Sequence, residues 1–240
     1  MNFINNKSSY VSSAAAGVSY DVGLRTYMIK VYNYMAISLV ISGLIAFFTA
    51  SSPVLMQALF NTPLSWVVMF APLAFVFFFG YKLQTMSAET AKNCLWIFSS
   101  LMGLSLASIF VIYTGNSIAR VFFISASTFG LTSLYGYTTK KDLSGLGSFM
   151  IMGLIGLMIA SLVNLFLQSS AFQFATSVLG VFIFIGLTAY DSQRVKQMYY
   201  QSYGNVEAAS KMAVLGALSL YMDFINLFLM MLNLFGDRKN

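Results

Sequence analysis

The stretch "LYMDFINLFLMML", residues 220–232, decides which kinds of fold are open to this chain. It holds one carboxylate, Asp223, and one amide, Asn226, in a run that is otherwise almost wholly apolar. In water, a carboxylate in such a run would be an unusual core residue. In a bilayer, a carboxylate at helix-centre depth costs ~2.5–3.5 kcal/mol on insertion scales and faces the bundle interior or water. The role of Asp223 therefore depends on the solvent of the chain.

Composition identifies that solvent. The chain has 240 residues, of which 58% are hydrophobic and only 8% are charged. A soluble domain has about 25% charged residues, so this chain is too poor in charge to cover a water-facing surface. The composition predicts an all-α membrane protein with several membrane-spanning helices.

The residue types that are missing exclude several classes of function. The chain has no histidine and a single cysteine, Cys94. Histidine-type zinc sites, serine–histidine catalysis and internal disulfides are therefore excluded. The net charge of +6 comes without any basic cluster longer than two residues, so we expect no nucleic acid partner. We expect no enzymatic activity and no bound organic cofactor.

Charge-free length locates seven spans, because a helix needs ~20 residues to cross the hydrocarbon core. Short loops between them predict one compact domain over residues 31–236. Residues 1–30 are predicted to be a polar, mostly disordered tail without a signal peptide, and residues 237–240 a short C-terminal tail. The predicted spans are Val31–Ala50, Leu64–Tyr81, Asn93–Tyr113, Val121–Tyr137, Phe149–Leu167, Phe172–Tyr190 and Met212–Phe235.

Lysine and arginine predict the orientation, because they are concentrated in cytoplasmic loops. With the N-terminus in the cytoplasm, Arg120 is the only basic residue in an outer loop. Arg238 and Lys239 break this rule if the seventh segment crosses, and the alternative is that it enters and returns. We favour crossing, because no proline interrupts the segment. The inner basic residues are Lys7, Arg25, Lys30, Lys82, Lys92, Lys140, Lys141, Arg194, Lys196 and Lys211.

Polar residues of the seventh segment share one helical stripe. Ser219, Asp223 and Asn226 are spaced four and three residues apart, which places them on one face. The sixth span ends in "GLTAYDSQRVK", where Thr188 lies one turn before Asp191. These polar groups either join helices to one another or form a functional site. We favour the functional interpretation for the two aspartates, because an ionisable group joins helices poorly.

The fifth span offers one more polar group, Asn164, for which we favour the structural role of joining helices. If Asp191 and Asp223 meet, two carboxylates in a low-dielectric site cannot both ionise cheaply, so they would share a proton. Their protonation would then change nearer to neutral pH. Ionised together, they would attract a hard cation such as calcium through oxygen ligands.

Three quoted motifs resemble the transmembrane Bax inhibitor motif family. They are "GLTAYDSQRVK", "ALSLYMDFINLFLMMLNLFG" and "TTKKDLSGLGSFM", and the resemblance covers the chain from about Arg25 to Gly236. It implies six helices around a central seventh. It also implies a hydrogen-bonded pair, Asp191 and Asp223, that senses pH and controls a calcium leak. The N-terminal "YDVGLRTYMIKVYNYMAISL" resembles bacterial members, which implies the bacterial inner membrane.

The chain departs from the family in its second span. A basic residue there can act as a latch on the aspartate pair, and Lys82 is the only candidate. Lysine lacks the bidentate fork of arginine. Some members also carry an acidic residue in the second span, whereas this chain has none between Asp21 and Glu89. This departure weakens the expectation of rapid calcium conduction.

We therefore predict a pH-sensitive calcium or cation leak channel, a monomer whose partners are the lipid bilayer, calcium ions and protons. The alternative is a non-conducting scaffold that regulates a membrane-protein partner, such as a protease or a stress-response or cell-death complex. An intramembrane aspartyl protease would need a Gly-x-Gly-Asp motif, but Asp223 follows "LYM". A retinal protein would need a lysine deep in the last span, but Lys211 lies at its boundary.

Topology reporters test the orientation. A reporter fused after Lys30 should read cytoplasmic, and a reporter inserted in "SSPVLMQ", residues 51–57, should read external. The physical reason is the asymmetry of lysine and arginine between the two sets of loops. Reversed signals from the two fusions would contradict the assignment.

Overall fold

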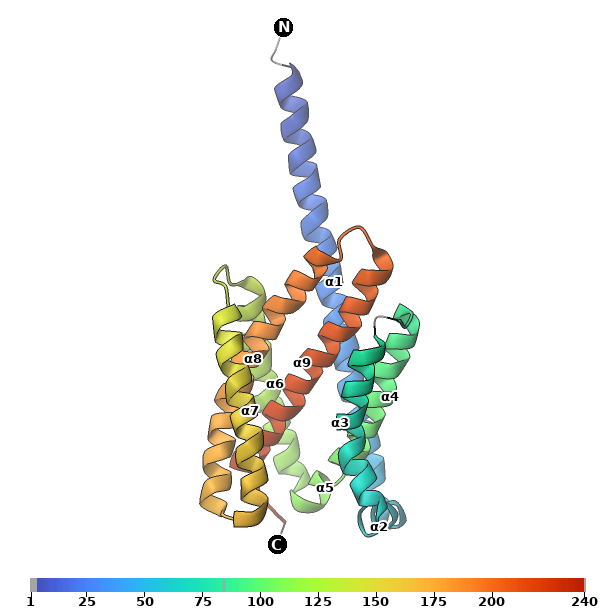
Figure 1. The fold of residues 1–240 in the computed structure, drawn as a ribbon, viewed down its shortest axis with the longest axis vertical. Coiled ribbons are helices and arrows are strands. Elements are labelled where there is room, and N and C mark those ends of the chain that lie inside the picture. The colour runs from blue at the N-terminus through green and yellow to red at the C-terminus, as the bar shows by residue number, and fades with distance from the viewer. Residues whose placement is uncertain (1–3, 84, 240) are drawn as a thin grey trace.

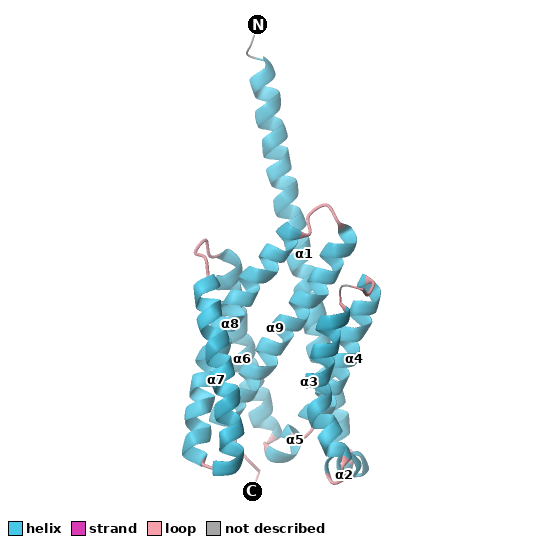
Figure 2. Ribbon diagram, in the orientation of Figure 1, coloured by secondary structure: helices cyan, strands magenta, loops and turns pink. Residues whose placement is uncertain are grey.

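The computed structural model describes the backbone of residues 4–83 and 85–239, with side chains from Val22 onward. Within these ranges the chain forms nine helices and no strand (Figures 1 and 2). The helices are α1 (Ile4–Ala50), α2 (Pro53–Phe60), α3 (Leu64–Lys82), α4 (Ala88–Leu106), α5 (Ile109–Ile112), α6 (Gly115–Thr138), α7 (Ser144–Leu167), α8 (Ser170–Gln201) and α9 (Val206–Phe235).

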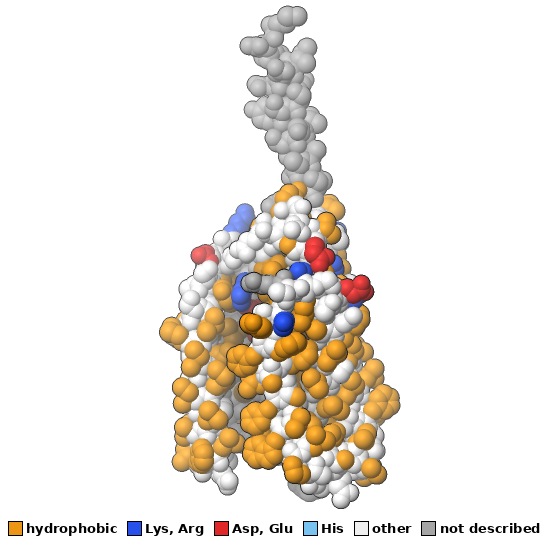
Figure 3. Space-filling view, turned by 45° about the vertical axis from the view of Figure 1, so that its right-hand side comes forward, with side chains coloured by type: hydrophobic (Ala, Val, Ile, Leu, Met, Phe, Trp, Pro, Cys, Tyr) orange, Lys and Arg blue, Asp and Glu red, His pale blue; other side chains and the backbone are white. Residues whose placement is uncertain are grey.

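Seven helical segments are long and apolar enough to span a membrane, as predicted, which confirms the all-α fold class. Hydrophobic side chains cover the sides of the bundle, and charged side chains gather near the end from which α1 projects (Figure 3). This is the surface that a bilayer requires. The segments are Val22–Ala50, Leu64–Lys82, Ala88–Ile112, Gly115–Thr138, Ser144–Leu167, Ser170–Gln201 and Val206–Phe235.

The N-terminal region differs from the prediction of a disordered tail. Helix α1 begins at Ile4 and runs without a break into the first span, so its first part extends beyond the bundle (Figure 1). Adding a residue to an existing helix avoids the cost of nucleation. The three successive alanines at 14–16 have the highest helix propensity of all residues, which favours this extension.

Side-chain caps explain where several helices begin. Ser87, Thr114, Ser169 and Asn205 each accept a hydrogen bond from a backbone N–H of the first turn that follows, at the starts of α4, α6, α8 and α9. These N–H groups have no partner within the helix, so a cap contributes about 1 kcal/mol. Gln168 ends α7 in the left-handed conformation, with φ of 47°.

Helix α9 is the centre of the bundle. It has the largest buried share of the seven spans, 67% against 6% for α7. It packs extensively against α8, α1, α6 and α4, whereas α3 packs on α4 and α7 packs on α8. The central position of the seventh span is confirmed, but a ring of six helices around it is not.

Two glycines allow helices to approach closely at backbone level. A Cβ on Gly136 of α6 would collide with the backbone of Ala189 in α8. A Cβ on Gly103 of α4 would collide with the backbone of Ser42 in α1. Helices in lipid have no hydrophobic driving force for association. Small residues at such crossings let the helices pack closely, and this packing holds them together.

A hydroxyl cluster joins α1, α4 and α9 in the core. The hydroxyl of Ser42 lies 2.8 Å from the carbonyl oxygens of both Ser38 and Ser99, and 2.6 Å from the hydroxyl of Tyr221. Because Ser42 has a single hydroxyl proton to share between the two carbonyls, Tyr221 must donate to Ser42. Tyr221 is fully buried and lies two residues before Asp223. The cluster therefore fixes α9 next to its aspartate.

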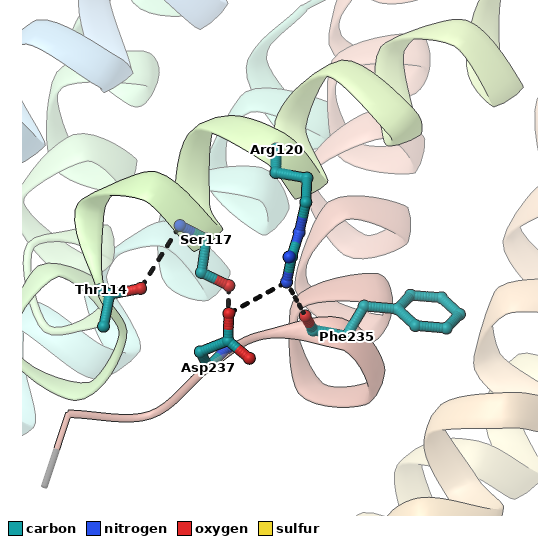
Figure 4. Close-up of polar contacts among 5 residues, drawn as sticks. All are labelled: Thr114, Ser117, Arg120, Phe235 and Asp237. Carbon is teal, nitrogen blue, oxygen red and sulfur yellow. Dashed lines mark hydrogen bonds and ion pairs between the residues drawn. The ribbon is translucent and has the colours of Figure 1, made fainter.

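The C-terminal segment after α9 folds back onto the loop between α5 and α6 (Figure 4). Asp237 forms an ion pair with Arg120 at 3.0 Å, and its backbone N–H donates to the hydroxyl of Ser117 at 2.8 Å. Arg120 also donates to the carbonyl oxygen of Phe235 at 3.0 Å. Thr114 completes the contact by donating its N–H to the carbonyl oxygen of Asp237.

These contacts explain the two charges that break the orientation rule. Lys239 donates from its ammonium to the carbonyl oxygen of Phe110 at 2.7 Å and from its backbone to that of Ile112. Arg238 lies over the ring of Tyr113, 6.0 Å from its centre. Cations are favoured at the carbonyl end of a helix, here α5. Helix α9 is continuous, and its C-terminal end lies at the end of the bundle opposite to the one from which α1 projects (Figure 1), so the segment runs the length of the bundle and does not return.

Gln193 of α8 holds the loop between α6 and α7. Its amide oxygen accepts from the N–H of Leu143, and its amide nitrogen donates to the carbonyl oxygen of Lys141, both at 2.8 Å. In the same loop, Asp142 accepts from the N–H and hydroxyl of Ser144, which holds the pKa of this exposed carboxyl below its ordinary value. Two of the motifs singled out in the sequence therefore meet at Gln193.

Replacing this glutamine tests the contact. Gln193→Leu should lower the free energy of unfolding by about 1–3 kcal/mol, because a buried N–H and a carbonyl of the loop lose their partners. Thermal unfolding of the purified protein in detergent measures the change. The matched control is Gln197→Leu, an exposed glutamine one turn further along α8, which should have little effect. Equal losses in both variants would contradict the assignment.

Candidate functional site

Asp223 lies in the middle of α9 and is enclosed by protein. Only 6% of its surface is exposed. Its Oδ2 atom has no hydrogen-bond partner among the described residues. An unpaired buried carboxylate oxygen is costly, because burial removes water without supplying another donor. Most buried polar groups are paired, so an exception of this kind marks a candidate site.

Asp191 lies on α8, the helix that packs most extensively against α9. Gly216 of α9 lies against Val195, and Gly180 of α8 lies against Met230, which fixes the register of the two antiparallel helices. Both aspartates fall between these two contacts. The side chain of Asp191 is 14% exposed. The contact between the two carboxylates and their shared hydrogen bond both stay predictions.

The basic residue nearest to Asp191 is Arg194, one turn along the same helix. Its guanidinium is 4.0 Å from the carboxylate and its side chain is 49% exposed, so this ion pair is long and accessible to solvent. Lys82, predicted as a latch, is exposed, and its ammonium lies 5.8 Å from the ring centre of Tyr81. Sequence reasoning missed Arg194, although its spacing of three from Asp191 is a signal of pairing on a helix.

The predicted supporting residues have local roles. Thr188 donates to the carbonyl of Phe184 at 2.7 Å, and Asn226 to that of Met222 at 2.9 Å, both within their own helices. The side-chain oxygen of Asn164 accepts from the N–H of a residue in the turn between α7 and α8. Ser219 is half-buried on α9, one turn from Asp223. Their roles in a functional site stay predictions.

A polar cavity of about 220 Å³ lies between α7, α8 and α9, on the side of Asp223 that faces the C-terminal end. Asn164, Gln173 and Asn233 line it together with Ser161 and Ser177. Asn233 also accepts a hydrogen bond from Tyr113 at 2.9 Å. Along α9, Asn226 lies between this cavity and Asp223, so polar side chains follow the helix from its C-terminal end to its middle.

The pair alone supplies few ligands for a cation. Among the described residues no cluster of three or more histidine, cysteine or acidic side chains exists. Two carboxylates offer four oxygen atoms, whereas calcium takes six to eight oxygen ligands. A calcium ion at Asp191 and Asp223 would therefore keep part of its water shell, which suits an ion in transit better than a tightly held one.

The chain is similar in sequence to several bacterial proteins and matches one family pattern. The family pattern described as inhibitor of apoptosis-promoting Bax1 matches residues 24–240. The chain is 46% identical to a protein of Rickettsia prowazekii, over 96% of this chain and 97% of the relative. It is 47% identical to a protein of Caulobacter vibrioides, over 93% of each. It is 44% identical to the inner membrane protein YbhL of Escherichia coli, over 90% of this chain and 94% of that relative.

Asp223→Asn tests whether the enclosed carboxylate is a cost to the fold. At neutral pH and above, the change should raise the free energy of unfolding by about 1–3 kcal/mol, because the amide needs no charge to be buried. Chemical or thermal unfolding in detergent measures this. Asp142→Asn is the matched control: its carboxylate is exposed and hydrogen-bonded, so the change should not stabilise. A destabilised Asp223→Asn protein would contradict the interpretation.

Proposed function

The chain belongs to the Bax inhibitor family as a multi-pass inner-membrane protein, and from this premise we propose that it is a pH-sensitive cation leak channel. Asp191 and Asp223 are its proposed sensor, and calcium is its proposed cargo. Calcium acts here as the transported ion and not as a resident cofactor. We propose no enzymatic reaction for the protein.

One observation carries this proposal: the carboxylate of Asp223 is enclosed at the centre of the bundle and has an oxygen atom without a partner among the described residues, on the helix that packs most extensively against the helix of Asp191. A purely structural role would favour a neutral side chain, since breaking or omitting one partner of a buried charge destabilises a fold strongly. Ionisable groups within membrane spans are functional candidates for the same reason.

Protonation of the pair would set the state of the channel. A single proton shared between the carboxylates leaves one negative charge and holds α8 and α9 together. Loss of that proton at higher pH leaves two like charges in contact in a low-dielectric interior. Their repulsion loosens the two helices, and their joint charge attracts a divalent cation. Low pH therefore favours the closed form, and rising pH favours the leak.

The proposed path begins at the polar cavity near the C-terminal end. An ion would pass from Asn233 and Asn164 to Asn226, then to the two aspartates, and leave along Ser219 at the end where α8 and α9 join. We propose that this second end is cytoplasmic, in agreement with the gathering of lysine and arginine there (Figure 3). Asp223 is buried, and we assign the described conformation to the closed form.

A calcium flux series in liposomes tests the proposal. Purified protein should leak calcium without partners, with a rate that rises up to about tenfold per pH unit below the midpoint, as a single titrating proton allows. Asp191→Asn and Asp223→Asn should each flatten this dependence. The double variant should add little, because the two residues act as one unit. Asp142→Asn, which changes an exposed loop carboxylate, should keep the wild-type curve.

Other outcomes of the series identify other functions. If the purified protein leaks no calcium at any pH, the channel proposal fails and a scaffold that regulates a membrane partner takes its place. If acid opens the channel and Arg194→Gln removes this response, a basic latch on an ionised Asp191 controls the gate. If all the proteins give one curve, the aspartates are not the sensor.

A further inference from the structure

A groove separates α1 and α6 on the surface of the bundle. Both helices pack against α9, but they make no extensive contact with each other. The space between them has a volume of about 550 Å³, within the range of small-molecule sites. Its walls consist almost entirely of apolar side chains of α1 and α6.

The groove opens toward the hydrocarbon of the bilayer. Ile29 and Leu134 on its two edges are 49% and 58% exposed, and both lie in membrane-spanning segments. Gly130 lies in the α6 wall, and a Cβ on it would meet no atom within 4 Å. An apolar hollow of this size on the membrane-facing surface fits a lipid acyl chain.

One end of the groove is cationic. Arg25 borders this end, is exposed, and has no hydrogen bond or ion pair with another described residue. On the α6 side, the ammonium of Lys196 lies 3.3 Å from the carbonyl oxygen of Tyr137 and 5.7 Å from the centre of its ring. Arginine binds phosphate through two parallel hydrogen bonds, so this end complements a phosphate group.

We infer that the groove between α1 and α6 binds one anionic phospholipid of the surrounding membrane, with an acyl chain between the helices and the phosphate on Arg25. The apolar walls recognise the chain, and Arg25 recognises the charge of the headgroup. The inference does not depend on whether the protein conducts ions.

A bound lipid would contact side chains that connect the groove to the centre of the bundle. Tyr32 in the groove wall shares a 2.7 Å hydrogen bond with Ser133, which shares another with Ser192, the neighbour of Asp191. Leu39 lines both this groove and a second hollow of about 290 Å³, which Phe224 of α9 also lines. A bound lipid would thus pack against side chains that connect to both helices of the aspartate pair.

Lipid retention by the full chain tests the charge recognition. The purified protein is mixed with equal amounts of phosphatidylglycerol and phosphatidylcholine, and the bound lipids are counted by native mass spectrometry. Wild-type protein should retain the anionic lipid in about tenfold preference, as one charge-assisted contact allows. Arg25→Gln should reduce this preference to near unity. Lys140→Gln, which removes an exposed charge from the loop after α6, should preserve it.

Filling the groove tests the acyl-chain site. Gly130→Leu should lower the retention of both lipids severalfold and keep the wild-type unfolding temperature, because its side chain enters open space. Gly80→Leu is the matched control: it makes the same change on the exposed face of α3 and should retain lipid as wild type does.

Three results would overturn the inference. They are undiminished lipid retention by Gly130→Leu, equal loss of preference in Arg25→Gln and Lys140→Gln, and a dimer of the wild type that Gly130→Leu converts to a monomer. The last result would assign the groove to a second copy of the chain. If Gly130→Leu proves unstable, the Arg25 and Lys140 pair decides the question alone, since both positions are exposed.

Discussion

The structure depends on one constraint: a helix that carries a carboxylate at its centre cannot face hydrocarbon. Asp223 forces α9 into the middle of the bundle, and the helix is accordingly the most buried of the seven spans. Four helices enclose it, and α3 and α7 lie on the outside, packed on α4 and α8. The central place of α9 therefore agrees with the position of its ionisable side chain.

Asp223 is enclosed by protein, but the polar contacts of its carboxylate are incomplete. Tyr221 donates to Ser42 and so fixes α9 against α1 and α4, two residues from Asp223. The carboxylate of Asp223 keeps an oxygen atom without a hydrogen-bond partner among the described residues.

At both ends of the bundle, polar side chains form hydrogen bonds with backbone groups of the loops. At one end Gln193 bonds to the loop between α6 and α7, and at the other Lys239 donates to the carbonyls that close α5. The tail contact with Arg120 closes the end of α9 against α6. Basic residues outside the apolar band thus contribute to local structure.

The sequence by itself determined the solvent, the seven spans and the two candidate aspartates, because hydrophobic length and the cost of a charge in lipid are local properties. Only the tertiary structure decided what depends on contacts distant in the chain. It placed Arg194, and not Lys82, beside Asp191, and it joined the C-terminal tail to the loop before α6. It also left α1 and α6 apart, since the separation of two helices depends on how both pack against a third.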